Sequence, residues 1–172
     1  DASPFASDGR KRRKEGKPMN WQTYPAHVLQ SLPADGPGRD PLILQARLVG
    51  ELGELADAST SPARVLEAGD VLFFVAALER VYGLTLSEVE SSYVGEAPRL
   101  NGAALVNALA CVARIGQMLA KNVEHKEPID RNLIHLWLYG VRHWTFCAVA
   151  PAMPAEVMAA NVRKLDAKWG RV

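Results

Sequence analysis

A strong helix-start signal followed by leucines at helical spacing governs the first half of the chain. Asp40 precedes Pro41, and an acidic N-cap residue with proline at the first helical position is typical of a helix N-terminus. Leucines then recur every three or four residues, at Leu44, Leu48, Leu52 and Leu55. This spacing places them on one side of a helix. We therefore predict a helix over residues 41–58 that directs these leucines inward.

Similar signals divide the rest of the chain into helices. Ser61 with Pro62 begins a second helix that Gly83 ends, Asn101 caps another, and Asp130 a further one. The helix after Asp130 runs through Leu133, Leu136, Trp137 and Val141. Besides 41–58, we predict helices over residues 21–32, 61–82, 85–93, 101–122, 130–149 and 155–168. Because no stretch has the alternation of a strand, we predict an all-α fold, a helical bundle.

The first 18 residues differ from the rest in composition. They carry six Lys or Arg against three acidic residues, and Phe5 is their only large apolar side chain. Such a segment buries too little surface to offset the entropy of ordering, so we expect a flexible basic tail. We expect Met19 to be the native first residue and the tail to be a cloning addition. A basic arm for nucleic acid or membranes is the alternative.

The remaining residues, 19–172, carry 14 basic and 16 acidic side chains, which argues against a nucleic-acid-binding body. A hydrophobic fraction of 48% suits a single domain. We find no apolar run near the ~18–20 residues of a membrane span, and no secretory signal. We therefore expect a cytoplasmic protein without membrane contact. Cys111 and Cys147 lie in apolar helical surroundings and are expected to be buried free thiols.

Four carboxylates form two pairs on either side of the predicted turn at residues 59–62. Glu51 and Glu54 are three residues apart, as are Glu67 and Asp70, so each pair lies on one face of its helix. The turn brings the two helices together, and the four carboxylates would converge. Small neighbours should allow close helix approach: Gly50, Gly53, Ala56, Ala68 and Gly69.

Gathered carboxylates repel one another, which favours a metal site over a solvated acidic surface. Ligands that offer only oxygen favour Mg²⁺ or Mn²⁺ over zinc. A di-iron site typically pairs a glutamate with a histidine three residues later, and none of the four histidines has that spacing.

The second half of the chain resembles the first. Two stretches align, 49–56 with 112–119 and 69–73 with 140–144. The counterparts of Glu51, Glu54 and Asp70 are Arg114, Gln117 and Val141. We expect a tandem pseudo-repeat with a catalytic half (19–95), a degenerate half (101–172) and one site per chain. Helical periodicity shared by unrelated segments is the alternative explanation.

The arrangement Glu51-x-x-Glu54, twelve residues, then Glu67-x-x-Asp70 resembles the signature of the MazG-like all-α NTP pyrophosphohydrolase superfamily. The residues around these acids, and the stretch 82–89, resemble that family too. Residues 161–165 resemble its closing helix, which contains an asparagine. The resemblance is strongest over residues 40–90 and is looser elsewhere.

The resemblance implies hydrolysis of a nucleoside triphosphate between the α- and β-phosphates, giving a nucleoside monophosphate and pyrophosphate. It implies two or three Mg²⁺ or Mn²⁺ ions held by Glu51, Glu54, Glu67 and Asp70. Glu54 is expected to be the catalytic residue that orients the attacking water. The short spacing between the acid pairs resembles MazG-type members and favours dGTP or GTP, with dUTP, dCTP and phosphoribosyl-ATP as alternatives. A homo-oligomer, dimer or tetramer, is also implied.

Triphosphate binding needs further donors. Basic side chains are available in the second half: Lys121, Lys164, Lys168 and Arg171. Asn161 can contact the sugar or base, although a solvated surface role is an equal alternative for each of these. Trp21 and Tyr24 can stack on a base or belong to the core. A function of another class, a non-catalytic helical interaction module whose acids stabilise assembly, stays open.

Overall fold

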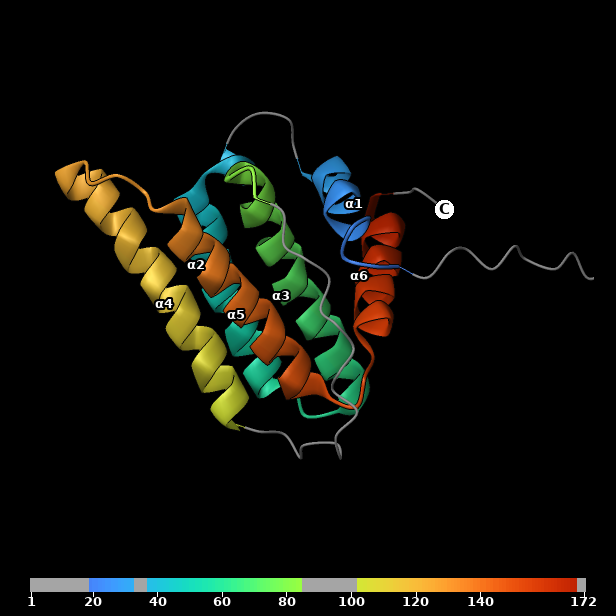
Figure 1. The fold of residues 1–172 in the computed structure, drawn as a ribbon. Coiled ribbons are helices and arrows are strands. Elements are labelled where there is room, and N and C mark those ends of the chain that lie inside the picture. The colour runs from blue at the N-terminus through green and yellow to red at the C-terminus, as the bar shows by residue number, and fades with distance from the viewer. Residues whose placement is uncertain (1–18, 33–36, 85–101, 170–172) are drawn as a thin grey trace, which may run out of the picture.

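The computed structural model describes residues 19–32, 37–84 and 102–169, and these residues are helical without any strand (Figure 1). The helices are α1 (Tyr24–Ser31), α2 (Pro41–Asp57), α3 (Ser61–Val81), α4 (Gly102–His125), α5 (Arg131–Val149) and α6 (Pro154–Trp169), with a short 3₁₀ helix η1 (Pro37–Arg39). The predicted all-α fold is confirmed. The predicted tail at 1–18, helix at 85–93, cap at Asn101 and donor at Arg171 lie outside the described residues.

Side-chain caps fix where three of the helices begin. Asp40 and Asp130 each accept hydrogen bonds from two backbone N–H groups in the first turn of their helix, at 2.8 to 3.4 Å. The cap of α3 is Thr60 rather than Ser61, because the Thr60 hydroxyl accepts from a first-turn N–H. Gly83 follows α3 with a φ of 60°, a conformation that glycine adopts without strain.

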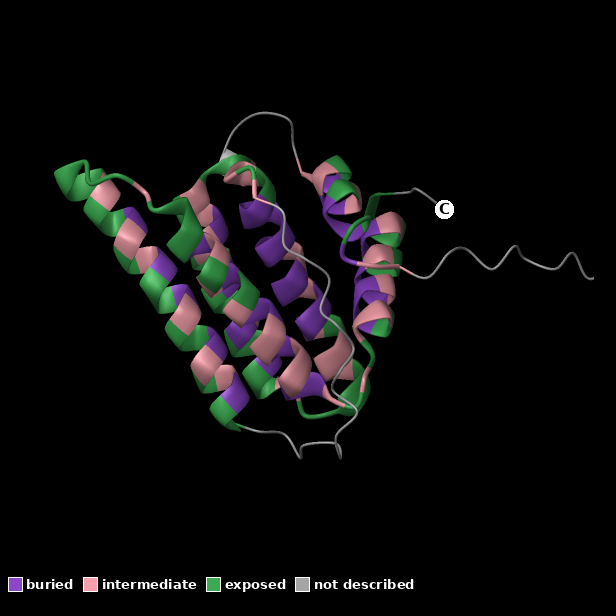
Figure 2. Cartoon of the chain, viewed as in Figure 1, coloured by how far each residue is buried: buried purple, intermediate pink, exposed green. Residues whose placement is uncertain are grey.

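Two antiparallel helix pairs form the body of the molecule (Figure 1). The pair α2–α3 packs against the pair α4–α5, with α2 on α4 and α3 on α5. Helices α1 and α6 pack together against α3. Buried residues lie on the faces that the helices turn toward one another (Figure 2). One continuous core results, and it contains the four predicted leucines of α2, each at most 4% exposed.

Helix α5 directs one side of its apolar residues inward and leaves others exposed. Ile134, Leu138 and Val141 are fully buried. Leu133 and Leu136 are 38% and 60% exposed, so these two do not belong to the core.

Helix α4 is the one described helix that by itself has the length and hydropathy of a membrane span, with a mean hydropathy of 1.5. Helices α5 and α6 meet the same criteria only as a pair, bent by 97°. Arg114 interrupts the apolar run of α4, so the sequence shows no uninterrupted apolar stretch of that length there. About one residue per turn of α4 is buried against its neighbours: Ala104, Ala108, Val112, Ile115 and Leu119. One such helix is by itself weak evidence for a membrane span.

The expectation that Gly50 and Gly53 allow α3 to approach α2 is wrong. Both are exposed, and a Cβ built on either meets no atom within 4 Å. Of the three glycines beside the acids, Gly69 is the one that a close contact requires. A Cβ there would lie 2.8 Å from the Cβ of Asn161, so Gly69 accommodates α6 and not α2.

Alanine substitutions at two of these glycines should have opposite effects on stability. Gly50→Ala should stabilise the protein by roughly 0.5–1 kcal/mol, because alanine loses less backbone entropy in a helix and has free space here. Gly69→Ala should destabilise it by roughly 1–3 kcal/mol through overpacking against α6. Urea unfolding of both variants measures the difference, and equal changes would contradict the assigned packing.

Candidate functional site

Three of the predicted acids form a cluster where α2 faces α3. Glu51, Glu54 and Glu67 each offer a carboxylate oxygen, and these atoms lie within 4.8 Å of one another. Glu54 is exposed, while Glu51 and Glu67 are half-buried. We call these three residues the acidic cluster. The metal-ligand atoms that it offers are all carboxylate oxygens, so it can hold a hard divalent cation.

The turn between α2 and α3 places the two acidic faces opposite each other. Only residues 58–60 separate the helices. Arg64 in the first turn of α3 reaches back and donates to the carbonyl oxygens of Ala58 at 2.9 Å and Ser59 at 3.3 Å. The buried leucines of α2 pack into the core and so fix the helix that carries Glu51 and Glu54.

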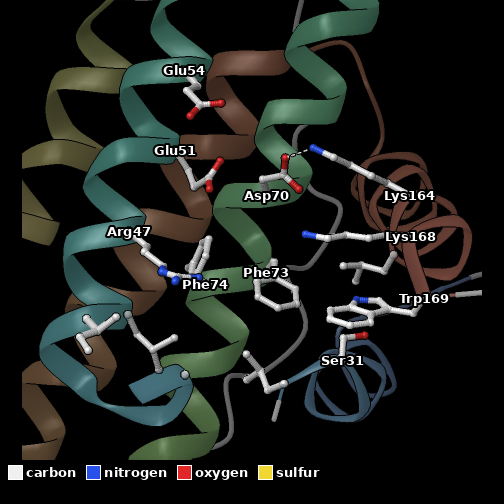
Figure 3. A pocket seen from close by; sticks show the side chains of 15 residues that line it. Ser31, Arg47, Glu51, Glu54, Asp70, Phe73, Phe74, Lys164, Lys168 and Trp169 are labelled. Carbon is white, nitrogen blue, oxygen red and sulfur yellow. Dashed lines mark hydrogen bonds and ion pairs between the residues drawn. The ribbon is translucent and has the colours of Figure 1, made fainter. Parts of the chain in front are cut away.

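Asp70 lies one turn after Glu67 on α3 but makes its contacts with α6. Its Oδ1 accepts a hydrogen bond from Asn161 Nδ2 at 2.8 Å. Its Oδ2 pairs with the ammonium group of Lys164, the contact drawn as a dashed line in Figure 3. Asp70 is therefore close to the acidic cluster but tied to α6.

Crowding of negative charge alters the titration of the site. Burial, and then the charges of Asp70, Glu54 and Glu67, raise the pKa of Glu51 to about 7, although Lys164 opposes the shift. Burial also raises the pKa of Glu67. The pKa of Lys164 is raised despite its partial burial, because Asp70 accepts its hydrogen bond and the neighbouring acids favour its charge. A cation bound here would relieve the repulsion that these shifts reflect.

A cleft of about 600 Å³ extends from the acids between α2, α3 and α6 (Figure 3). Glu51, Glu54 and Asp70 line one end of it. Lys164 lies at this end too, paired with Asp70, and Arg47 and Lys168 lie along the middle (Figure 3). Toward the other end lie the aromatic side chains of Phe73 and Trp169 (Figure 3). The cleft thus passes from anionic to cationic to aromatic walls.

Sequence reasoning missed Arg47, Phe73 and Trp169. Arg47 lies four residues before Glu51, so one face of α2 carries both, and this spacing could have identified it. Phe73 follows Asp70 by three residues, which gives the same signal on α3. Trp169 adjoins Lys168 and is 52% exposed. No local pattern marks it, because only the packing of α6 on α3 brings it to the cleft.

The predicted substrate-binding residues divide into three groups. Lys164 and Lys168 line the cleft. Asn161 is fully buried beside Asp70. Lys121 is exposed on α4, which packs on α2 and α5 and not on the α6 side, so the structure does not bring it to the cleft.

The two N-terminal aromatic residues belong to the core, as one of the two interpretations predicted. Trp21 is 4% and Tyr24 is 0% exposed. The Trp21 indole donates to the Glu79 carboxylate at 3.0 Å, and the Arg142 guanidinium lies 4.7 Å from the indole centroid. Neither ring is accessible for stacking on a ligand.

Comparison of the chain with protein-family models, with curated proteins and with solved structures found no match. The resemblance to the MazG-like superfamily therefore rests on the residues that carry it. The tandem repeat likewise stays a prediction.

The raised pKa of Glu51 predicts a pH-dependent stability of the metal-free protein. Its ordinary pKa is 4.5 and its folded-state pKa is about 7, so the folded state binds more protons between these values. Stability from this group is fully present below about pH 4.5 and is lost as the pH rises through 7. Glu51→Gln should therefore raise the thermal midpoint more at pH 8 than at pH 5.

Thermal unfolding in EDTA across this pH range measures the effect. Glu127→Gln, which removes an exposed acid just after α4, is the matched control and should leave the profile unchanged. Parallel profiles for Glu51→Gln and the unaltered protein would contradict the raised pKa of Glu51.

Proposed function

We propose that the chain is a metal-dependent nucleoside triphosphate pyrophosphohydrolase, which cleaves the α–β phosphoanhydride of a (d)NTP to (d)NMP and pyrophosphate. The observation that carries this proposal is one cleft in which the carboxylates of Glu51, Glu54 and Asp70 adjoin basic and then aromatic side chains. The order matches the parts of a metal-bound nucleotide, which are cations, phosphates and base. The resemblance of the acid spacing to the MazG-like superfamily supports the same reaction.

Glu51, Glu54, Glu67 and Asp70 would hold two or three Mg²⁺ or Mn²⁺ ions. These ions, when bound, supply Lewis-acid activation of water and neutralise phosphate charge. Glu54 is the exposed member of the acidic cluster, so its carboxylate is best placed to accept a proton from the attacking water. Glu51 and Glu67 are less accessible and serve as ligands.

Arg47, Lys164 and Lys168 would bind the phosphate oxygens of the substrate. Guanidinium and ammonium groups are the standard donors to phosphate, with arginine able to bind in bidentate fashion. Lys164 neutralises Asp70 in the described structure and is half-exposed, so its ammonium can turn from carboxylate to phosphate.

The aromatic end of the cleft would take the base. Phe73 and the exposed face of Trp169 offer π-surfaces, and the volume of about 600 Å³ is within the range of ligand pockets. We propose a purine, dGTP or GTP, on the resemblance of the acid spacing, and a homo-oligomer on the same resemblance. The competing class is a non-catalytic helical module.

The decisive measurement is pyrophosphate release across all common NTPs and dNTPs. Activity should appear with Mg²⁺ or Mn²⁺ and vanish in EDTA. Glu54→Gln and Asp70→Asn should each lower kcat/KM by about 100-fold or more, since even groups behind the ligands typically cost 10–100-fold. Arg114→Ala and Gln117→Ala should change it less than about 2-fold, because they lie on α4 outside the cleft. Folded, metal-loaded protein that hydrolyses none of these nucleotides would favour the interaction module.

Trp169 allows a separate test of the base site. Base–aromatic stacking contributes about 1–3 kcal/mol, so Trp169→Ala should raise KM by about tenfold while kcat changes little. Trp169→Phe keeps an aromatic face and is the matched control, expected to retain most of the affinity. Steady-state kinetics distinguish the two, and equal KM values for all three proteins would place the base elsewhere.

A further inference from the structure

Asp70 ends a buried chain of hydrogen bonds that crosses three helices. The Asn161 amide of α6 donates to Asp70 Oδ1 of α3 at 2.8 Å, and the Tyr24 hydroxyl of α1 donates to Asn161 Oδ1 at 2.8 Å. Tyr24 and Asn161 are 0% exposed, whereas the Asp70 side chain keeps 17%. The chain of bonds is therefore closed to solvent except at the carboxylate.

The orientation of the Asn161 amide follows from its two partners. A carboxylate only accepts, so the amide NH₂ must face Asp70 and the amide oxygen must face Tyr24. Burial and the charge of Asp70 raise the pKa of the Tyr24 hydroxyl well above its ordinary value, which keeps it a donor. The reversed amide would set its oxygen against the carboxylate, two acceptors in a buried site.

Close helix packing holds the amide at this position. Because residue 69 is glycine, the α3 backbone can approach Asn161 to a distance that any Cβ would prevent. The Tyr24 hydroxyl also lies 3.3 Å from the Gly69 carbonyl oxygen, a second acceptor that ties α1 to the same turn of α3. The geometry at Asp70 is thus fixed by α1 and α6 together.

We propose that Asn161, oriented by Tyr24, is a positioning residue that holds Oδ1 of the Asp70 carboxylate, so that Oδ2, which the Lys164 ammonium contacts, is the oxygen that faces a divalent cation once that ammonium moves aside. The inference rests on the proposed function for the role of Asp70 as a metal ligand. It assigns Asn161 a place behind the metal site instead of a contact with sugar or base. Outer hydrogen-bond partners of this kind typically change metal affinity by 10–100-fold when removed.

The test is Mn²⁺ binding to the whole chain without nucleotide, measured by electron paramagnetic resonance. Tyr24→Phe removes one hydroxyl and lets the amide turn, and it should weaken Mn²⁺ binding by about tenfold or more. Asn161→Leu removes the donor itself and should weaken binding at least as much. Tyr82→Phe removes a tyrosine hydroxyl roughly 18 Å along α3 and should bind Mn²⁺ as the unaltered protein does.

A positioning role also predicts that excess metal restores activity. If nucleotide is hydrolysed, saturating Mn²⁺ should restore most of the kcat of Tyr24→Phe, which damage to the fold would not allow. Thermal unfolding in EDTA shows whether each variant is folded. If Asn161→Leu is not folded, the Mn²⁺ affinity of Tyr24→Phe alone tests the proposal.

Folded Tyr24→Phe that binds Mn²⁺ as tightly as the unaltered protein overturns the inference, as does an unaltered protein that binds no Mn²⁺. Unchanged Mn²⁺ affinity with intact hydrolysis would overturn the positioning role and leave the proposed function standing. Weakened Mn²⁺ binding in a protein that hydrolyses no nucleotide would support the positioning role while the proposed function fails.

Discussion

The carboxylates of α2 and α3 repel one another, and the site depends on the hydrophobic packing of the two helices, which offsets this repulsion. Three carboxylates have oxygens within 4.8 Å of one another, and burial, followed by the charges of Asp70, Glu54 and Glu67, raises the pKa of Glu51 to about 7. The buried leucines of α2 pack against the core that α3 shares, and their burial outweighs the repulsion between charges at the surface. The acids stay together because the core leaves the two helices no other arrangement.

Helix α6 completes the site that α2 and α3 begin. Over less than three turns it contributes Asn161, Lys164, Lys168 and Trp169. Asn161 holds Asp70, and Lys164 neutralises it. Lys168 lines the middle of the cleft, and Trp169 closes its aromatic end. The one close contact that this requires is with Gly69, where a side chain would push α6 outward. A single glycine therefore links the packing of the bundle to the composition of the cleft.

The parts of the site that sequence could predict are those governed by local rules. N-cap and proline signals, leucine spacing and i, i+3 carboxylates predicted α2, α3 and the acidic cluster, because each acts within one helix or across one short turn. Trp169 and the role of Asn161 could not be predicted, since both depend on which side of α3 the last helix packs. Gly50 and Gly69 illustrate the same limit. Their sequence contexts are alike, yet one is exposed and the other is required by a helix almost one hundred residues later.

The second helix pair shows why a carboxylate pattern cannot simply be transferred by alignment. Arg114 and Gln117, the counterparts of Glu51 and Glu54, are exposed on α4. Val141, the counterpart of Asp70, is fully buried in the core instead of facing α6. An aspartate at 141 would be buried among apolar side chains, where an unpaired charge costs several kcal/mol. Under the predicted alignment, acids placed at all three positions would not meet, because the third would lie inside the bundle. Within the described residues, Glu51, Glu54 and Glu67 are the one group of acids whose oxygens gather in this way.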